Sequence, residues 1–191
     1  MNKSKTRCAW VPPGNALYEA YHDTEWGVPV HDDQKHFEFL ILEGAQAGLS
    51  WLTVLKRRVA YRKAFSDFDP HEVAQFDSKK IENLLENEEI IRNRLKIESA
   101  VNNAKQFIEV QKEFGTFDEY IWSFVGGETL QNKWKTVKEI APKTDESIAL
   151  SKDLQKRGFK FVGPTIIYAH MQAVGMVNDH TLDCFRHSQL R

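Results

Sequence analysis

Four residues with metal-binding side chains lie near the two ends of the chain. Cys8 and His22 stand in the N-terminal segment, and His180 and Cys184 stand four residues apart near the C-terminus. A spacing of four predicts that the latter two share one face of a helix. Two Cys with two His form the closed ligand set typical of structural zinc, which would tie the two ends of the chain together. The alternative is a pair of free buried thiols, because a disulfide is not expected in a reducing cytoplasm.

Glu43 is a carboxylate in an apolar setting. It follows the run Leu40-Ile41-Leu42 and precedes a stretch of small residues that leads to Trp51. A carboxylate buried without a partner is costly or takes up a proton, and a cationic or amine-bearing ligand would relieve that cost. The alternative is a Glu near a helix end that caps the helix or forms an ion pair.

Aromatic residues recur in the first third of the chain. The set consists of Trp10, Tyr18, Tyr21, Trp26 and Trp51. Stacked rings of this kind can hold a flat base between them. The alternative is that these residues are simply part of the hydrophobic core.

A short turn bounded by Gly158 and Gly163 separates two expected helices. Glycine lets the backbone bend sharply, and Pro164 begins a helix whose free N–H groups would attract an anion. The cations around this turn, against the single acid Asp153, are Lys152, Lys156, Arg157 and Lys160. The pattern favours a helix-hairpin-helix that holds a DNA phosphate without reading sequence, and the alternative is an ordinary corner between two helices.

The elements that must position these residues are expected to be helices. Apolar residues at helical spacing, preceded by capping residues, predict an all-α protein of about eight short helices. The expected helices cover 36–42, 51–65, a short stretch from Pro70, 81–85, 91–113, 117–125, 144–158 and 164–175. Residues 128–143 are the least regular part.

Length and charge limit the function classes. A chain of 191 residues is one domain or two small lobes sharing a core. The formal net charge of −1 means that any nucleic-acid site must be a local patch, and residues 51–65 carry five positive charges and no negative one. No apolar run is long enough for a membrane span. The N-terminus has cations without an apolar stretch behind them, so we expect a cytoplasmic protein.

Several segments, in order, resemble the 3-methyladenine DNA glycosylase I family over nearly the whole chain. They are C-A-W at 8–10, Y-H-D-T-E-W-G at 21–27, L-E-G-A-Q-A-G-L-S-W at 42–51, W-S-F-V at 122–125, K-R-G-F-K-F-V-G at 156–163 and V-N-D-H at 177–180. Long segments in the right order make a more specific match than any single motif.

The resemblance implies a helix-hairpin-helix DNA glycosylase fold, all-α, with two helical lobes and the N- and C-termini joined at a zinc site. Residues 1–191 would form a single compact unit with the helix-hairpin-helix at about 145–175. A zinc-binding lobe would consist of residues 1–30 plus 176–191. The family carries a structural Zn²⁺, and its ligands match Cys8, His22, His180 and Cys184. We expect a monomer.

The resemblance also implies an activity, the hydrolysis of the N-glycosidic bond of 3-methyladenine in alkylated duplex DNA. The base would be flipped out of the stack and an abasic site left behind, without lyase activity. Glu43 matches the catalytic carboxylate that hydrogen-bonds the base edge. The positions that match base-binding residues are Tyr21, Trp51, Trp10 and Tyr18. Those that match DNA contacts are Gly48 and Leu49, which enter the gap left by the base, and Gly158, Lys160, Gly163 and Thr165, which hold the backbone.

Two departures and two alternatives stay open at this stage. Asn178 stands where many relatives in the wider superfamily have an Asp, an absence that fits this branch, and Ala45 replaces a larger expected residue and could alter the pocket. One alternative function is a zinc-stapled DNA-binding module without catalysis, which has no use for a buried Glu43. The other is a glycosylase for a different alkylated base.

Overall fold

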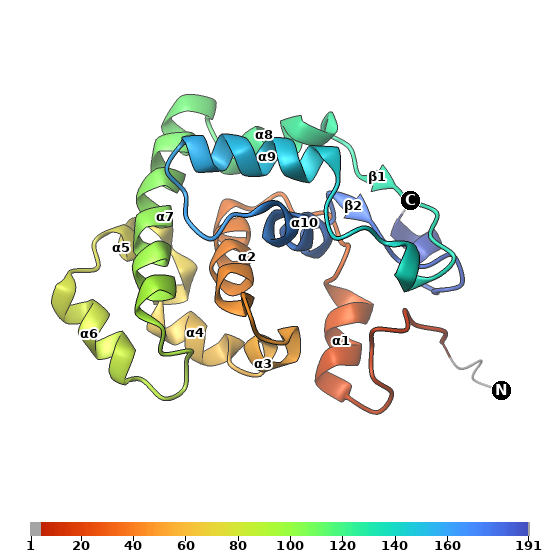
Figure 1. The fold of residues 1–191 in the computed structure, drawn as a ribbon, viewed down its shortest axis with the longest axis horizontal. Helices are drawn as coiled ribbons and strands as arrows, with labels where there is room; N and C mark the ends of the chain where they lie inside the picture. Colours follow the sequence, from red (N-terminus) through yellow and green to blue (C-terminus); the bar gives the residue numbers. More distant parts are fainter. Residues whose placement is uncertain (1–4, 191) are drawn as a thin grey trace.

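The computed structural model describes residues 5–190, which fold into a mainly helical structure (Figure 1). The α-helices are α1 Ala16–Thr24, α2 Asp33–Gln46, α3 Trp51–Leu55, α4 Arg58–Ala64, α5 Pro70–Ala74, α6 Ser78–Glu86, α7 Arg94–Phe114, α8 Phe117–Trp122, α9 Asp145–Lys156 and α10 Pro164–Ala173. Short 3₁₀ turns occur at Ser66–Phe68, Ser123–Val125, Val137–Glu139 and His187–Leu190. Two short strands, β1 Leu130–Gln131 and β2 Val177–Asn178, pair in parallel. The expectation of a mainly helical protein is confirmed.

Local capping explains where most helices begin. Asp32 accepts a hydrogen bond from the Lys35 N–H at the start of α2, and Asp69 precedes Pro70 at the start of α5. At α9 the Thr144 and Ser147 side chains bond reciprocally to each other's backbone N–H groups. These starts lie within a few residues of the sequence-based predictions.

The predicted helix over 51–65 is wrong in one respect, because the chain bends within it. α3 ends at Leu55 and α4 begins at Arg58, with the Arg57 N–H donating to Val54 O in a tight turn. The bend lets both short helices bury their apolar residues, including Val54 on α3 and Tyr61 on α4. Burial on two differently directed pieces therefore outweighs the continuity of one helix.

Two further local expectations are corrected. α1 was not predicted, because only Tyr21 and His22 of its residues are buried and its apolar periodicity is weak. His180 and Cys184 do not share a helix face: they follow β2 in a turn, where the Cys184 N–H donates to Thr181 O. The hydrogen bonds of β2 carry the chain away from helical geometry before these residues are reached.

The centre of the molecule is α2 (Figure 1). Its residues from His36 to Ala45 are all buried, and it packs against α3, α7, α8 and α10. The cluster of buried hydrophobic side chains includes residues of both chain halves, from Cys8 to Cys184. α2 is therefore a rigid platform for any side chain that it carries. The predicted division into two lobes stays a prediction.

The turn at 157–163 joins α9 to α10, and the helix-hairpin-helix stays a prediction. Gly158 has φ +93°, a left-handed conformation that favours glycine, and Phe161 also has a positive φ of +54°. Gly163 has an ordinary φ of −61°, and a Cβ there would meet nothing within 4 Å. The first glycine is thus required by the bend, whereas the second leaves the backbone open to an approaching molecule. Among the helices within residues 5–190, none is long and apolar enough to cross a membrane.

Candidate functional site

A cavity of about 220 Å³ lies beside α2 and brings together residues from distant parts of the chain. Its lining residues are Trp10, Tyr18, Tyr21, Trp26, Glu43, Gln46, Trp51, Ile140, Ala169 and Gln172. All of the base-binding residues expected from the sequence are among them. The tertiary structure therefore places Glu43 and the aromatic set in one pocket.

Glu43 is the one acidic side chain among the residues that line this cavity. Its side chain is buried on α2, and no residue in the described part of the chain donates a hydrogen bond to its carboxylate. Burial raises the pKa of Glu43 to about 8. The carboxyl is thus largely protonated at neutral pH when the pocket is empty, and a cationic ligand would draw out the proton.

Aromatic rings flank the carboxyl. The Tyr21 and Trp51 ring centroids lie 5.3 Å apart at 47°, and Phe39 stacks behind Trp51 at 6.5 Å. Trp10 makes edge contacts with Tyr18 and Trp26. Burial, and then the charge of Glu43, raises the pKa of Tyr18 and of Tyr21, in agreement with their nearness to the carboxyl. The pocket is therefore lined by aromatic rings around one acid.

Sequence reasoning missed four residues that line this cavity, namely Gln46, Ile140, Ala169 and Gln172. Gln46 lies one helical turn beyond Glu43 on α2, so the i, i+3 spacing could have identified it. Ile140 and Gln172 come from segments more than 90 residues away, and no local pattern marks them. The Gln172 amide N–H donates to buried Asp179 at 2.7 Å. Ala45 does not line the cavity, so the expectation that it alters the pocket has no support in the contacts.

A second hollow, of about 380 Å³, continues from the pocket toward the start of α10. It is lined by Glu43, Gln46, Ala47, Gly48, Leu49, Thr165, Ile166 and Ala169. Leu49 is 43% exposed, although it is apolar, and Gly48 has φ +78°. The structure thus brings the loop after α2 beside Thr165, whereas Gly158, Lys160 and Gly163 lie on the neighbouring turn and do not line this hollow.

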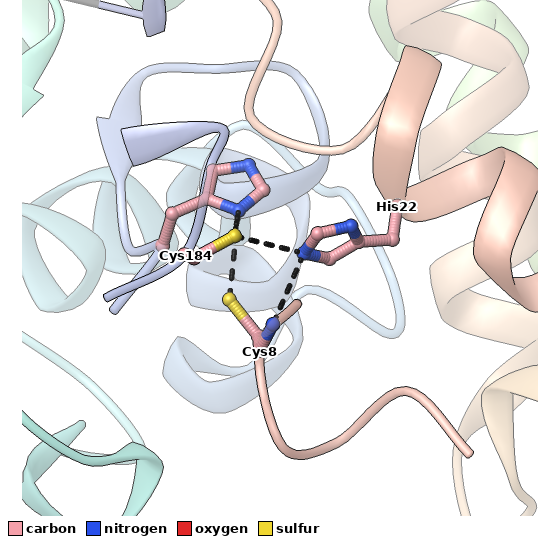
Figure 2. Close-up of side chains that lie close together, drawn as sticks. Cys8, His22 and Cys184 are labelled. Carbon is pink, nitrogen blue, oxygen red and sulfur yellow. Dashed lines mark hydrogen bonds between the residues drawn. The ribbon is translucent and has the colours of Figure 1, made fainter. Parts of the chain in front are cut away.

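The four metal-binding side chains converge behind the pocket (Figure 2). One ligand atom from each of Cys8, His22, His180 and Cys184 lies within 4.8 Å of the others. Cys184 Sγ lies 3.4 Å from His22 Nε2 and 3.4 Å from His180 Nδ1, and Cys8 Sγ lies 3.5 Å from His180 Nδ1. A tetrahedral metal with bonds of about 2.0 Å to nitrogen and 2.3 Å to sulfur has edges of about 3.5 Å. The three sulfur-to-nitrogen distances of 3.4 to 3.5 Å therefore match the edges of a tetrahedral site.

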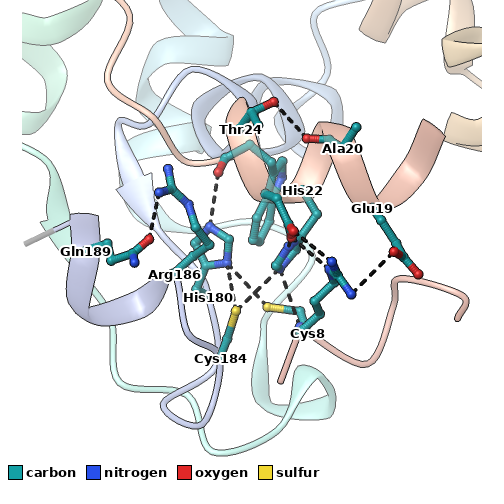
Figure 3. Close-up of polar contacts among 12 residues, drawn as sticks. Cys8, Glu19, Ala20, His22, Thr24, His180, Cys184, Arg186 and Gln189 are labelled. Carbon is teal, nitrogen blue, oxygen red and sulfur yellow. Dashed lines mark hydrogen bonds and ion pairs between the residues drawn. The ribbon is translucent and has the colours of Figure 1, made fainter. Parts of the chain in front are cut away.

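The other nitrogen of each imidazole is already occupied. His22 Nδ1 lies 2.8 Å from Asp23 Oδ1, and His180 Nε2 lies 3.0 Å from Trp26 O. Arg7 in turn donates two hydrogen bonds of 2.8 Å to the Asp23 carboxylate. Outer contacts of this type orient metal-binding histidines. In Figure 3 both labelled rings point toward the two sulfurs.

The two thiols differ in pKa: the hydrogen bond between them raises the pKa of Cys8 and lowers that of Cys184. Hydrogen bonds from the Cys8 thiol and from the two imidazoles lower the pKa of Cys184, because they stabilise its thiolate. His22 belongs to the same helix as Tyr18 and Tyr21, and its ring makes an edge contact of 5.3 Å with Trp10. Asn178 lies beside the cluster, where it donates to His187 O and accepts from the His180 N–H. It does not line the cavity.

Comparisons with known proteins agree with one another. A family model described as methyladenine glycosylase matches residues 10–187. The chain is 48% identical over 178 residues to DNA-3-methyladenine glycosylase 1 of Escherichia coli (strain K12), covering 93% of this chain and 95% of that protein. It is 47% identical to DNA-3-methyladenine glycosylase of Haemophilus influenzae, covering 94% of this chain and 96% of that one.

Solved structures show the same likeness. The fold matches a crystal structure of 3-methyladenine DNA glycosylase I with a TM-score of 0.92 at 48% identity, over 94% of this chain and 98% of that chain. It also matches 3-methyladenine DNA glycosylase I from Staphylococcus aureus, described for its recognition of 3-methyladenine. There the TM-score is 0.91 at 36% identity, over 96% of this chain and 97% of the other.

Proposed function

This chain belongs to the methyladenine glycosylase family, and from that premise we propose that its cavity around Glu43 binds a 3-methyladenine base flipped out of DNA. The protein acts in base-excision repair as a glycosylase that removes 3-methyladenine. The observation that carries the assignment of the site is the buried carboxyl of Glu43, which has no hydrogen-bond partner among residues 5–190 and lies in a cavity lined by aromatic rings.

The substrate chemistry suits this pocket. Methylation at N3 places a positive charge on the adenine ring, so the base departs as a neutral molecule and needs little acid catalysis. The C1′–N9 bond breaks with its electron pair going to the base, and water forms the new bond to C1′ and loses a proton. The protein must therefore recognise the lesion, hold it outside the helix and favour its departure.

Glu43 supplies the recognition in this proposal. Its ionised carboxylate accepts a hydrogen bond from the exocyclic amine, which selects an adenine-type edge. The positive charge of the ring also offsets the free-energy cost of burying the ionised carboxylate, which no charge in the described part of the chain offsets when the base is absent. An uncharged adenine offers less compensation and has a stronger glycosidic bond, so discrimination has two sources.

The aromatic residues supply the contact with the ring faces. Trp51 and Tyr21 form one ring pair of the cavity lining, and Trp10 and Tyr18 form another. Stacking on a cationic ring contributes about 0.5 to 2 kcal/mol per contact. The Trp51 Nε1–H is buried without a partner among residues 5–190, so it is a further donor available to the ligand.

We assign DNA binding to the loop after α2 and to the turn before α10. Leu49 is apolar and exposed beside the pocket, as a group that fills the place of a flipped base would be. The N–H groups of Val162 and Gly163 donate to no acceptor within the described residues, although the Val162 carbonyl accepts from Ser151 Oγ, and Lys160 is exposed beside them. Free N–H groups at the start of a helix suit a phosphate.

We further infer that the four-residue cluster holds Zn²⁺. Two thiolates and two imidazoles with tetrahedral spacing and occupied outer nitrogens are a donor set that zinc prefers. A set of four protein ligands leaves no open position, so the ion supplies a structural crosslink. It would join the segment around Cys8 to the segment around Cys184 and hold α1, which carries Tyr18 and Tyr21.

The test is release of free base from duplex DNA treated with a methylating agent, resolved by chromatography. We expect wild type to release 3-methyladenine and Glu43→Gln to release it at least about 100-fold more slowly. Glu109→Gln is the matched control, because it makes the same change at an exposed position on α7. It should leave the rate unchanged.

Two results would contradict the proposal. Release dominated by another methylated base would keep the enzyme class and overturn the substrate. No release from folded protein that still binds DNA would favour the DNA-binding module without catalysis. Circular dichroism and thermal melting of Glu43→Gln establish that the variant is folded before its rate is read.

A further inference from the structure

We propose that Lys96 and Asn103, on one face of α7, are positioning residues that fix the two DNA-facing loops relative to each other. One loop is 47–49, after α2, and the other is 157–163, between α9 and α10. The inference rests on the proposed function, in which both loops contact DNA. Neither residue touches the cavity itself.

Lys96 holds the first loop. Its Nζ donates to Ala45 O at 2.8 Å and to Ala47 O at 2.6 Å. The last carbonyls of a helix have no partner within the helix and carry partial negative charge, and α2 has no basic residue in its own last turn. Lys96 therefore provides from α7 the cation that the end of α2 lacks. The loop that begins there leads directly to Gly48 and Leu49.

Asn103 holds the second loop. Its Oδ1 accepts from the Lys160 N–H at 2.8 Å, and its Nδ2 donates to Lys160 O at 2.8 Å. Both backbone groups of one turn residue are thus bonded to a single buried side chain. The neighbouring Asn102 donates to Gly158 O at 2.9 Å. The turn has no regular secondary structure of its own between 159 and 163. These amides therefore hold it from α7, while Ser151 Oγ holds Val162 O from α9 at 2.6 Å.

The two contacts share one rigid element. Lys96 and Asn103 are seven residues apart, which is about two helical turns and roughly 10 Å along the axis. α7 is a continuous helix of 21 residues that packs against α2, α5, α6 and α8. In Figure 1 it stands beside α2 and reaches the turn after α9. α7 thereby sets the separation of the loops as a spacer of fixed length.

This arrangement has a consequence for DNA binding. A duplex must meet both loops at once, so the second contact gains from the first only if their separation is already correct. Loosening either loop removes this gain. Loosening both loops cannot remove this gain in DNA affinity a second time, so the double variant should bind DNA about as weakly as a single variant. The effects of the two substitutions on folding stability should instead add, because the contacts are far apart.

The experiment compares Lys96→Met, Lys96→Arg, Asn103→Leu and the Lys96→Met/Asn103→Leu double variant. The probe is a duplex that contains a stable tetrahydrofuran abasic-site analogue. Lys96→Met and Asn103→Leu should each bind this duplex about tenfold more weakly than wild type. Lys96→Arg keeps a cation at the position and should bind it nearly as tightly as wild type. Lys105→Met is the matched control, because Lys105 is an exposed lysine on the same helix. It should bind as wild type does.

Two further measurements separate positioning from general damage. Binding of free 3-methyladenine, followed by tryptophan fluorescence, should change less than about twofold, because no residue of α7 lines the cavity. The decreases in melting temperature caused by the two single substitutions should add in the double variant. The DNA affinity of the double variant should instead be close to that of the weaker single variant.

Three outcomes would overturn the inference. These are unchanged DNA affinity in both single variants, a loss of free-base binding equal to the loss of DNA binding, and full additivity of the DNA effects. Failure of the proposed function gives a different result, since wild type would then release no 3-methyladenine. The abasic duplex reports on the loops independently of excision.

Discussion

Glu38 and Glu43 lie five residues apart on α2 and are buried to nearly the same extent, 3% and 4% exposed, yet their pKa values move in opposite directions. Burial acts on both carboxyls. For Glu38, hydrogen bonds from Arg58 at 2.7 Å and Lys35 at 2.8 Å outweigh burial and lower the pKa to about 2. For Glu43 burial is unopposed and raises the pKa to about 8. The helix therefore carries one carboxylate that is satisfied by the protein and one that is left for a ligand.

The rate of excision should depend on the ionisation of Glu43. Because the pKa in the empty pocket is about 8 and the carboxylate is the form that binds a cationic base, kcat/KM should rise with pH up to about 8 and level off above it. Below the pKa the rise should approach about tenfold per pH unit. Initial rates on methylated duplex DNA between pH 6 and 9 measure this. A flat profile over that range would show that Glu43 is already ionised in the free enzyme.

Glu38→Gln should destabilise the protein without changing the pocket. The substitution leaves Arg58 without its buried partner, which should reduce the free energy of unfolding by about 3 kcal/mol. The control Glu82→Gln breaks an exposed pair with Arg94 and should cost less than about 1 kcal/mol. Urea unfolding at pH 7 measures both. Excision per folded molecule should stay at the wild-type rate, because Glu38 does not line the cavity.

The same contacts predict acid sensitivity. A carboxyl with a lowered pKa in the folded state stabilises the protein above its unfolded pKa and loses that contribution as the pH falls. For Glu38 the loss should occur between about pH 4.5 and 2. Unfolding followed over this range should therefore show a smaller pH dependence in Glu38→Gln than in wild type, and identical slopes would contradict the assignment.

Removal of the metal should loosen the region around α1. Cys184→Ser, or wild type with a strong chelator, should contain less than one zinc ion per chain and melt at a lower temperature. Asp23→Asn should retain the ligands but bind zinc about 10- to 100-fold more weakly, because Asp23 orients His22. Metal content by mass spectrometry and thermal melting give both readouts. Full zinc occupancy in purified Cys184→Ser would exclude Cys184 as a ligand.

His170 predicts a second acid effect. Its ring is buried between α10 and α2 with both nitrogens unpartnered among the described residues, and burial followed by the charge of His36 lowers its pKa well below 6.5. In the unfolded chain the His170 imidazole takes up a proton near pH 6.5, whereas in the folded chain it stays neutral at that pH. The free energy of unfolding should therefore fall as the pH decreases below about 6.5. His170→Phe should weaken this dependence. Parallel stability curves for the two proteins from pH 7 to 5 would refute the explanation.

Helix positions were predictable because their causes are local. Asp32, Asp69 and Thr144 each cap a helix within three residues of their own position, and apolar residues repeat at helical spacing after them. The break at Lys56-Arg57 and the non-helical turn that holds His180 and Cys184 were not predictable in this way. Both depend on what the neighbouring segments pack against.

The candidate site shows the same division. The sequence pointed to Glu43, Trp51 and the four metal-binding residues, because unusual residue types in a recognisable order need no coordinates to be noticed. It did not identify Gln172 or Ile140 as walls of the cavity, nor Lys96 and Asn103 as supports of the loops, since each acts through a partner distant in the chain.

The sequence by itself determined the helical class, the family and the residue types of the site. Only the tertiary structure decided that nearby cations keep Glu38 ionised, whereas burial favours the uncharged, protonated form of Glu43. The physical reason is that a pKa depends on burial and on every charge within a few ångströms. Of the cations beside Glu38, Lys35 lies on α2 itself, whereas Arg58 comes from α4. The same carboxyl side chain on the same helix thus acquires two different roles from what the rest of the chain places beside it.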